Sequence, residues 1–132
     1  MHRRSFLLSA AALPLAGAAS AFGRNSGPGA VSEALARGET VFVDFWASWC
    51  GTCRTQSRVL EQLTSANPAY EAGITFIQID WDRHGDSALA RQLNIPRRST
   101  LVALKGDREI GRIVAGTAPG QIQGLLDAAL AA

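Results

Sequence analysis

The sequence of 132 residues is poor in the residues that build covalent or metal frameworks, with two cysteines and two histidines. Two cysteines exclude a disulfide-rich scaffold, which needs several bridges. No repeat or low-complexity segment recurs, which excludes solenoids, collagen-like chains and disordered tracts. Of all residues, 47% are hydrophobic and 18% are charged, a composition typical of one globular domain at this length.

The first 21 residues differ from the rest of the chain. Arg3 and Arg4 precede an apolar run that ends in small residues, an order that predicts an export signal over residues 1–21 with cleavage near Ala21. Removing this segment takes away two of the 13 basic residues and none of the 11 acidic ones, so the mature chain has no net charge. We therefore expect no nucleic-acid partner, because no basic field would attract one.

The signal also bears on the route and the destination. Residues 3–7, Arg-Arg-Ser-Phe-Leu, resemble the twin-arginine export motif, and the general secretory route stays open as an alternative. Both routes lead out of the cytoplasm, so we expect a periplasmic protein. The apolar run is rich in alanine and contains Pro14, and it falls short of the about 20 apolar residues that a spanning helix needs. We expect no stable membrane insertion after cleavage.

Residues 22–29 are rich in turn formers and predict a flexible leader, and residues 30–132 form the predicted domain. The spacing of apolar residues predicts helices at 30–37, 54–65, 87–93 and from Pro119, and strands at 41–46, 75–80, 100–105 and 108–115. Two strands joined by a helix favour a parallel pair, and a hairpin at Gly106-Asp107 adds antiparallel strands. The sequence therefore predicts an α/β fold with a central mixed β-sheet flanked by helices on both faces.

Cys50 and Cys53 lie between a predicted strand and the helix after it, where a metal site, a structural disulfide and a redox pair are all conceivable. Zinc needs four ligands, and the mature chain adds only His84 to the two thiols. A bridge that closes so short a loop constrains the unfolded chain little. A helix start favours a thiolate, so we expect Cys50 to attack a disulfide and Cys53 to resolve the mixed disulfide.

Residues 43–54, V-D-F-W-A-S-W-C-G-T-C-R, resemble the active-site signature of thioredoxins. The match includes an acid six residues before Cys50, a tryptophan directly before it, a glycine after it and a basic residue after Cys53. A weaker similarity continues through residues 101–116 and 125–130. The resemblance implies a thioredoxin fold and a thiol–disulfide oxidoreductase with a Cys50–Cys53 redox disulfide and neither cofactor nor metal.

The resemblance places the acid, Asp44, beneath Cys53 as its proton acceptor and donor. The physical argument agrees, because burial raises the pKa of a carboxyl group into the range that suits proton exchange near neutrality. The alternative is a solvated acid at a strand edge with no part in the chemistry.

The resemblance also implies a client-docking surface beside the cysteines, formed by Trp49, Gly51 and Thr52. Thr52 stands where thioredoxins commonly have proline, a change that bears on the thiol pKa. We expect Trp46 in the core, whereas Trp81 either fills the core or lines a substrate groove.

The chain departs from the family just before the predicted hairpin. Thioredoxin-like proteins carry there a cis-proline that faces the cysteines. Counting back from Thr100 puts Ser99 at that position, which we favour over Pro96, three residues earlier. A non-proline cis bond costs about 3 to 4 kcal/mol, so we expect a trans Arg98–Ser99 bond. Ser99 and Thr100 are expected to contact substrate, and the loss of proline opens the question of metal exclusion. Two interpretations of Arg97 and Arg98 are open. They are a solvated pair with no role, or they have a function, either as a contact for an acidic partner or as a stabiliser of the Cys50 thiolate.

These features predict an exported thiol–disulfide oxidoreductase acting on thiol- or disulfide-bearing exported proteins. The reductive direction is favoured because no histidine stands between the cysteines, as it does in oxidising relatives. A reductant outside the cytoplasm requires electrons from a membrane thiol donor. We expect a monomer. The alternatives are an oxidant or isomerase with the same residues, and a non-catalytic metal- or ligand-binding module.

Overall fold

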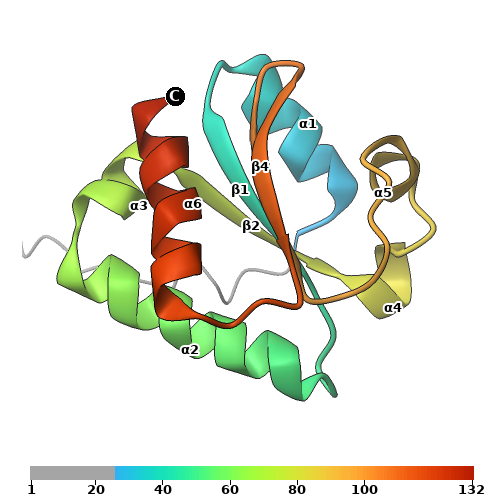
Figure 1. Cartoon of the computed structure of the whole chain (residues 1–132). Helices are drawn as coiled ribbons and strands as arrows, with labels where there is room; N and C mark the ends of the chain where they lie inside the picture. Colours follow the sequence, from blue (N-terminus) through green and yellow to red (C-terminus); the bar gives the residue numbers. More distant parts are fainter. Residues whose placement is uncertain (1–25) are drawn as a thin grey trace, which may run out of the picture.

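The computed structural model describes residues 26–132, so the predicted export signal lies outside the described residues. At the centre is a four-stranded sheet in the order β2-β1-β3-β4 (Figure 1). β1 (Thr40–Trp46) runs parallel to β2 (Thr75–Asp80) and antiparallel to β3 (Thr100–Lys105), and β3 pairs antiparallel with β4 (Arg108–Val114). The mixed sheet predicted from the sequence is confirmed.

Helices cover both faces of this sheet (Figure 1). They are α1 (Pro28–Ala36), α2 (Gly51–Ala66), α3 (Ala69–Gly73), α4 (Trp81–His84), α5 (Ala88–Gln92) and α6 (Pro119–Ala131). Phe42 packs in an apolar cluster with α2, α3 and α6, whereas Val43 and Phe45 pack in a second cluster with α1 and α5. Alternate residues of β1 thus enter two cores, which is why this strand is apolar along most of its length. No helix within residues 26–132 is long and apolar enough to cross a membrane.

Several helix boundaries differ from the prediction. α1 begins at Pro28, so two residues assigned to the leader form its first turn, where proline is well tolerated. The short helices α3 and α4 were not predicted, because four or five residues carry too little periodicity to be recognised. In α4 the Asp80 side chain accepts a hydrogen bond from the backbone N–H of Asp82 and caps the turn. His84 is the last residue of this helical turn and is half-buried.

Trp46, predicted in the core, and Trp81, for which two positions were predicted, occupy different places. Trp81 meets Phe45 edge to face, with ring centroids 6.2 Å apart and an interplanar angle of 88°. It is half-buried and packs both against the second core and against the small cluster that contains the two cysteines. Trp46, predicted in the core, is half-buried and packs instead against the small cluster of Ala47 and the two cysteines.

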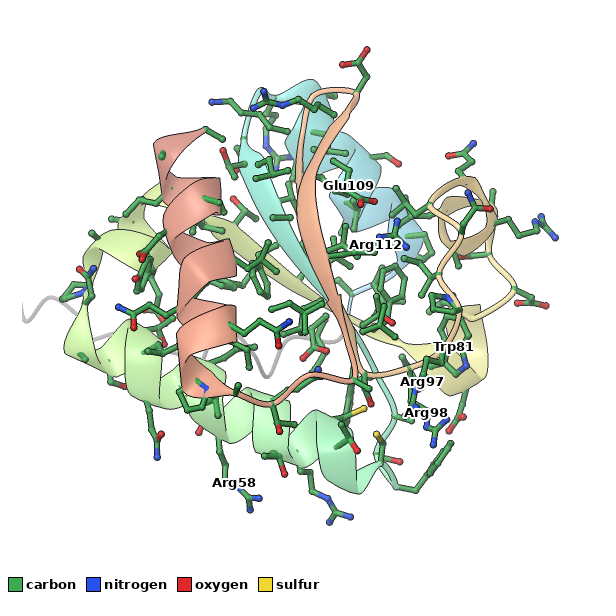
Figure 2. The ribbon with its side chains drawn as sticks, in the orientation of Figure 1. Arg58, Trp81, Arg97, Arg98, Glu109 and Arg112 are labelled. Atoms are coloured by element: carbon green, nitrogen blue, oxygen red, sulfur yellow. The ribbon has the colours of Figure 1, made fainter. Side chains whose placement is uncertain are left out.

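The segment that leads into β3 is tied to the sheet. Arg112 on β4 pairs with Glu109 (Figure 2). The same guanidinium donates to the backbone carbonyls of Leu93, at 2.6 Å, and Asn94, at 3.3 Å. These bonds fix the start of the loop that connects α5 to β3. The far end of this loop lies beside the carboxyl end of β1.

The carboxyl end of β1 is where the functional segments meet. Phe45 pairs with Thr100 at the start of β3, and α2 begins five residues after β1 ends. The two cysteines and the residues just before β3 are therefore brought to one edge of the sheet, although more than 40 residues separate them along the chain.

Candidate active site

The cysteine pair lies at the start of α2, as predicted. Cys50 is the N-cap residue, and its Sγ accepts a hydrogen bond from the backbone N–H of Cys53 at 3.1 Å. Both cysteines are in the thiol form. Cys50 keeps 3% of its surface exposed, whereas Cys53 has none. This difference agrees with Cys50 as the attacking thiol and Cys53 as the resolving one.

The two thiols are placed to ionise at different pH. Burial opposes ionisation of Cys50, but hydrogen bonds from the Cys53 thiol, the Ser99 hydroxyl and the Cys53 N–H, with the positive charge of Arg98, lower its pKa to about 7. Burial raises the pKa of Cys53, and its hydrogen bond to Cys50 raises it further. Near neutrality Cys50 therefore ionises before Cys53, which keeps its proton.

Ser99 faces the cysteines, at the position predicted for it. Its Oγ lies 3.0 Å from Cys50 Sγ and 3.1 Å from Cys53 Sγ. The residue is fully buried and adopts a left-handed φ of +62°, and no peptide bond in the described part of the chain is cis, so the Arg98–Ser99 bond is trans as expected.

Both backbone polar groups of Ser99 are used inside the protein. Its N–H donates to the carbonyl of Phe45 at 2.7 Å, and its carbonyl accepts from the N–H of Ala115 at 2.8 Å and from Gln56 Nε2 at 3.0 Å. What Ser99 presents to the site is therefore its hydroxyl.

Asp44 is buried in the middle of β1, so the alternative of a solvated acid is wrong. Burial raises the pKa of its carboxyl to about 7, against a smaller opposite effect of the neighbouring Gln78 and with an added rise from Cys50. Neither carboxylate oxygen forms a well-aligned hydrogen bond with a described residue. The group can thus exchange a proton near neutral pH, as a base for the resolving thiol would have to do.

Trp49, directly before Cys50, is held on the surface by two charged residues. It is 56% exposed, and its indole Nε1 donates to both carboxylate oxygens of Asp82 at 3.2 and 3.0 Å. The guanidinium of Arg98 lies over the ring, 4.5 Å from the centroid. Figure 2 shows Arg98 with Arg97 on the α4 side of the site. Arg98 is thus a partner of Trp49 and of the Cys50 thiolate, and the hypothesis of a solvated pair fails for it.

The other predicted contact residues divide between the surface and the interior. Gly51 is exposed and Thr52 half-buried in the first turn of α2, beside the cysteines. Thr100 is fully buried, and its hydroxyl donates to the carbonyl of Arg97 at 2.7 Å. Thr100 therefore stabilises the turn before β3 and has no free face toward a substrate.

Gln56 belongs to the site and was not predicted from the sequence. It is fully buried on α2, and its Nε2 donates to the carbonyls of Ser99 and Gly116, each at 3.0 Å. The signal that could have revealed it is its spacing, because Cys53, Gln56 and Leu60 fall on one buried face of the helix. A glutamine in that row requires a polar partner from elsewhere in the fold.

Within residues 26–132 no group of three or more His, Cys, Asp or Glu side chains is placed to hold a metal ion.

Comparisons with known proteins agree with this arrangement. The family model described as Thioredoxin matches residues 30–128. The thioredoxin of Mycolicibacterium smegmatis is 34% identical over 85 residues, which span 63% of this chain and 71% of that protein. Thioredoxin-1 of Saccharomyces cerevisiae is 30% identical over 91 residues, 69% of this chain and 82% of that protein. Among solved structures, the thioredoxin of Malassezia sympodialis superposes with a TM-score of 0.67 at 26% identity, covering 80% of this chain and 89% of that one.

Proposed function

This chain belongs to the thioredoxin family, and we propose that it reduces disulfide bonds of exported proteins outside the cytoplasm. Membership of the family confirms the predicted fold and makes the chain a thiol–disulfide oxidoreductase with a Cys50/Cys53 pair. The direction of exchange, the compartment and the partners are the proposed part.

The pKa of Cys50 is the observation that supports reduction of client disulfides over their formation. A strongly oxidising pair stabilises its thiolate so far that the pKa falls to about 3.5, whereas the reductant thioredoxin has a value of about 7. Cys50 has a pKa of about 7, because burial opposes the hydrogen bonds that it receives. Such a modest stabilisation of the thiolate does not stabilise the reduced form of the pair strongly. A pair of this kind is favoured as a reductant, which passes its electrons to a client disulfide.

The reaction then follows from the placement of three residues. The Cys50 thiolate attacks a client disulfide and forms a mixed disulfide, releasing one client sulfur. Cys53 loses its proton and attacks Cys50 Sγ, which releases the second client sulfur. Asp44, whose pKa of about 7 suits proton exchange, serves as the buried base for the second step. The cysteine pair ends oxidised and the client disulfide reduced.

The proposed compartment depends on the predicted export signal over residues 1–21, with the twin-arginine route favoured. An oxidised pair outside the cytoplasm cannot reach soluble cytoplasmic reductants, so a membrane thiol donor has to restore it. The clients proposed are exported proteins that bear cysteines, and Trp49 with its exposed face would be their first contact.

A redox titration of the mature protein, residues 22–132, tests the direction. The protein is equilibrated in glutathione and dithiothreitol buffers, free thiols are alkylated, and the Cys50–Cys53 state is determined by mass. We expect a potential near the about −270 mV of thioredoxin. A value of about −120 to −180 mV would make the protein an oxidant or isomerase and overturn the proposal. The Cys53→Ser variant, which can form no internal disulfide, is the control.

Fractionation of cells that produce the full chain tests the compartment. We expect the mature protein in the periplasm and the uncleaved precursor in the cytoplasm when Arg3 and Arg4 are both replaced by lysine. Mature protein in the cytoplasm would contradict the proposed export.

A further inference from the structure

The loop before β3 uses much of its backbone inside the protein, although it lies beside the cysteines. The N–H and the carbonyl of Ser99 are both bonded to other parts of the fold, and the Arg97 carbonyl accepts from the Thr100 hydroxyl. The carbonyl of Arg98 accepts a hydrogen bond from Arg97 Nε at 3.1 Å. A client that reaches the cysteines therefore meets mainly the side chains of this loop, and the side chain of Arg98 extends to the exposed Trp49.

The charge of Arg98 has no acidic partner, although the residue is half-buried. Its Nε is buried and has no hydrogen-bond partner among the described residues. None of the ion pairs within residues 26–132 includes Arg97 or Arg98. Because the fold has already removed part of the water around this guanidinium, an arriving carboxylate would gain its charge without meeting the whole cost of desolvation.

The guanidinium of Arg98 is held in an orientation that suits a carboxylate. It lies over the Trp49 ring, 4.5 Å from the centroid, and the indole is itself fixed by two hydrogen bonds to Asp82. A guanidinium stacked on an aromatic ring keeps its N–H groups in its own plane, where a carboxylate can accept two of them. The Asp82 carboxylate is bound to the indole and is not paired with Arg98, so this position stays open.

The same charge acts on the sulfur that a client has to reach. After the larger effects of burial and of the hydrogen bonds to its sulfur, the charge of Arg98 lowers the pKa of Cys50. A client bonded to Cys50 therefore places its neighbouring residues close to Arg98 and Trp49. Residues 22–132 carry equal numbers of basic and acidic side chains, so a preference for acidic clients has to come from this local charge and not from the field of the whole protein.

We propose that Trp49 and Arg98 form a docking surface for clients that carry an aspartate or a glutamate beside the reactive disulfide. The client carboxylate pairs with the Arg98 guanidinium, and its apolar stem lies against the Trp49 ring. A lysine at the same place in the client would be repelled. This inference deepens the proposed function, because it names the class of client. It rests on the exchange activity of the cysteine pair and not on the direction of exchange.

Competition between two peptides tests this surface. Both are short loops of one sequence closed by a disulfide, with either glutamate or lysine directly before one cysteine. They are mixed in equal amounts with limiting reduced protein at pH 7, and mass measurement gives the ratio of the two reduced peptides. This ratio compares the two kcat/KM values, so it does not depend on the amount of folded protein or on the reactivity of Cys50. Dividing by the ratio obtained with dithiothreitol removes the intrinsic difference between the two disulfides.

We expect the glutamate peptide to be reduced about fivefold faster than the lysine peptide, since a partly exposed ion pair is exchanged for a contact between like charges. The preference should shrink in about 1 M salt, which screens charges beyond about 3 Å. In Arg98→Met, which removes the charge but keeps an unbranched side chain, the preference should fall below about twofold. Arg98→Lys keeps the charge and should prefer the glutamate peptide more than Arg98→Met does.

Arg58→Met is the matched control. It removes a charge from an exposed side chain that points outward from α2 (Figure 2), so it should leave the preference of the original protein unchanged. Equal reduction of the two peptides by the original protein, or the same preference in that protein and in Arg98→Met, would overturn the proposal. If the redox titration gives an oxidising potential, the same peptides are supplied as dithiols to the oxidised protein and the ratio is measured again. The direction of exchange and the docking surface can therefore fail separately.

Discussion

The side-chain amide of Gln56 donates a hydrogen bond at 3.0 Å to the carbonyl of Ser99, 43 residues away in the sequence. The same amide donates to Gly116 at 3.0 Å, so one buried residue of α2 joins the loop before β3 to the loop after β4. The hydroxyl that faces the two sulfurs therefore owes its position to a helix residue that touches neither of them.

Replacing Gln56 by methionine should destabilise the protein and disturb the site together. The Gly116 carbonyl loses the side-chain donor of Gln56, and the Ser99 carbonyl keeps only the N–H of Ala115. Losing such hydrogen bonds costs about 1 to 3 kcal/mol in the free energy of unfolding. Urea unfolding measures this loss. The midpoint of the pH dependence of Cys50 alkylation should move to higher pH, because the Ser99 hydroxyl that stabilises the thiolate is no longer held in place. Gln62→Met, on the exposed side of the same helix, should change stability by less than about 0.5 kcal/mol. Equal effects of the two substitutions would contradict this role of Gln56.

Replacing Asp44 by asparagine should stabilise the protein increasingly as the pH rises. The pKa of this carboxyl is raised from 3.8 to about 7 by burial, so the folded state binds the proton more tightly than the unfolded state. The stability that this provides is full below about pH 4 and is lost as the pH rises through 7, by at most about 4 kcal/mol. Urea unfolding of both proteins from pH 4 to pH 8 should show the difference growing with pH. A difference independent of pH would mean that the carboxyl has an ordinary pKa in the folded protein.

Replacing Arg98 by methionine should make Cys50 less reactive at neutral pH. The positive charge of Arg98 lowers the pKa of the Cys50 thiol, after the larger effects of burial and of the Cys53 and Ser99 hydrogen bonds. For one partly exposed charge we expect about a twofold slower alkylation of Cys50 by iodoacetamide at pH 7, and a smaller difference in high salt. Arg58→Met removes a charge that points outward from α2 (Figure 2) and should leave the rate unchanged. A rate in Arg98→Met equal to that of Arg58→Met would show that the thiolate does not sense Arg98.

Replacing Trp49 by alanine should weaken the use of protein clients more than that of small disulfides. The indole is 56% exposed yet fixed by Asp82 and Arg98, so it offers a rigid apolar surface beside Cys50. We expect KM for a protein disulfide such as insulin to rise about fivefold or more, the loss of one anchoring contact of more than 1 kcal/mol. The rate with oxidised glutathione, which is too small to need this surface, should change less than about twofold. A similar loss with both substrates would place Trp49 in the chemistry of Cys50.

Much of the fold could be predicted because its signals are local. The strands at Thr75–Asp80 and Thr100–Lys105 have the predicted bounds, since runs of apolar and β-branched residues end at turn formers. The short helices α3 and α4 escaped prediction, because a single turn depends on a cap such as Asp80 and on packing more than on periodicity.

By itself the sequence determined the chemistry: a cysteine pair at a helix start, an acid inside an apolar strand, and a serine where a proline is usual. The first two follow from residue types and spacings of a few positions, which set local conformation and burial, whereas the third follows from the resemblance to thioredoxins. Only the tertiary structure decided what that serine does. Its left-handed backbone and the direction of its hydroxyl are set by hydrogen bonds to Phe45 on β1, Gln56 on α2 and Ala115 directly after β4. No local pattern encodes such contacts, because they exist only once those elements have packed together.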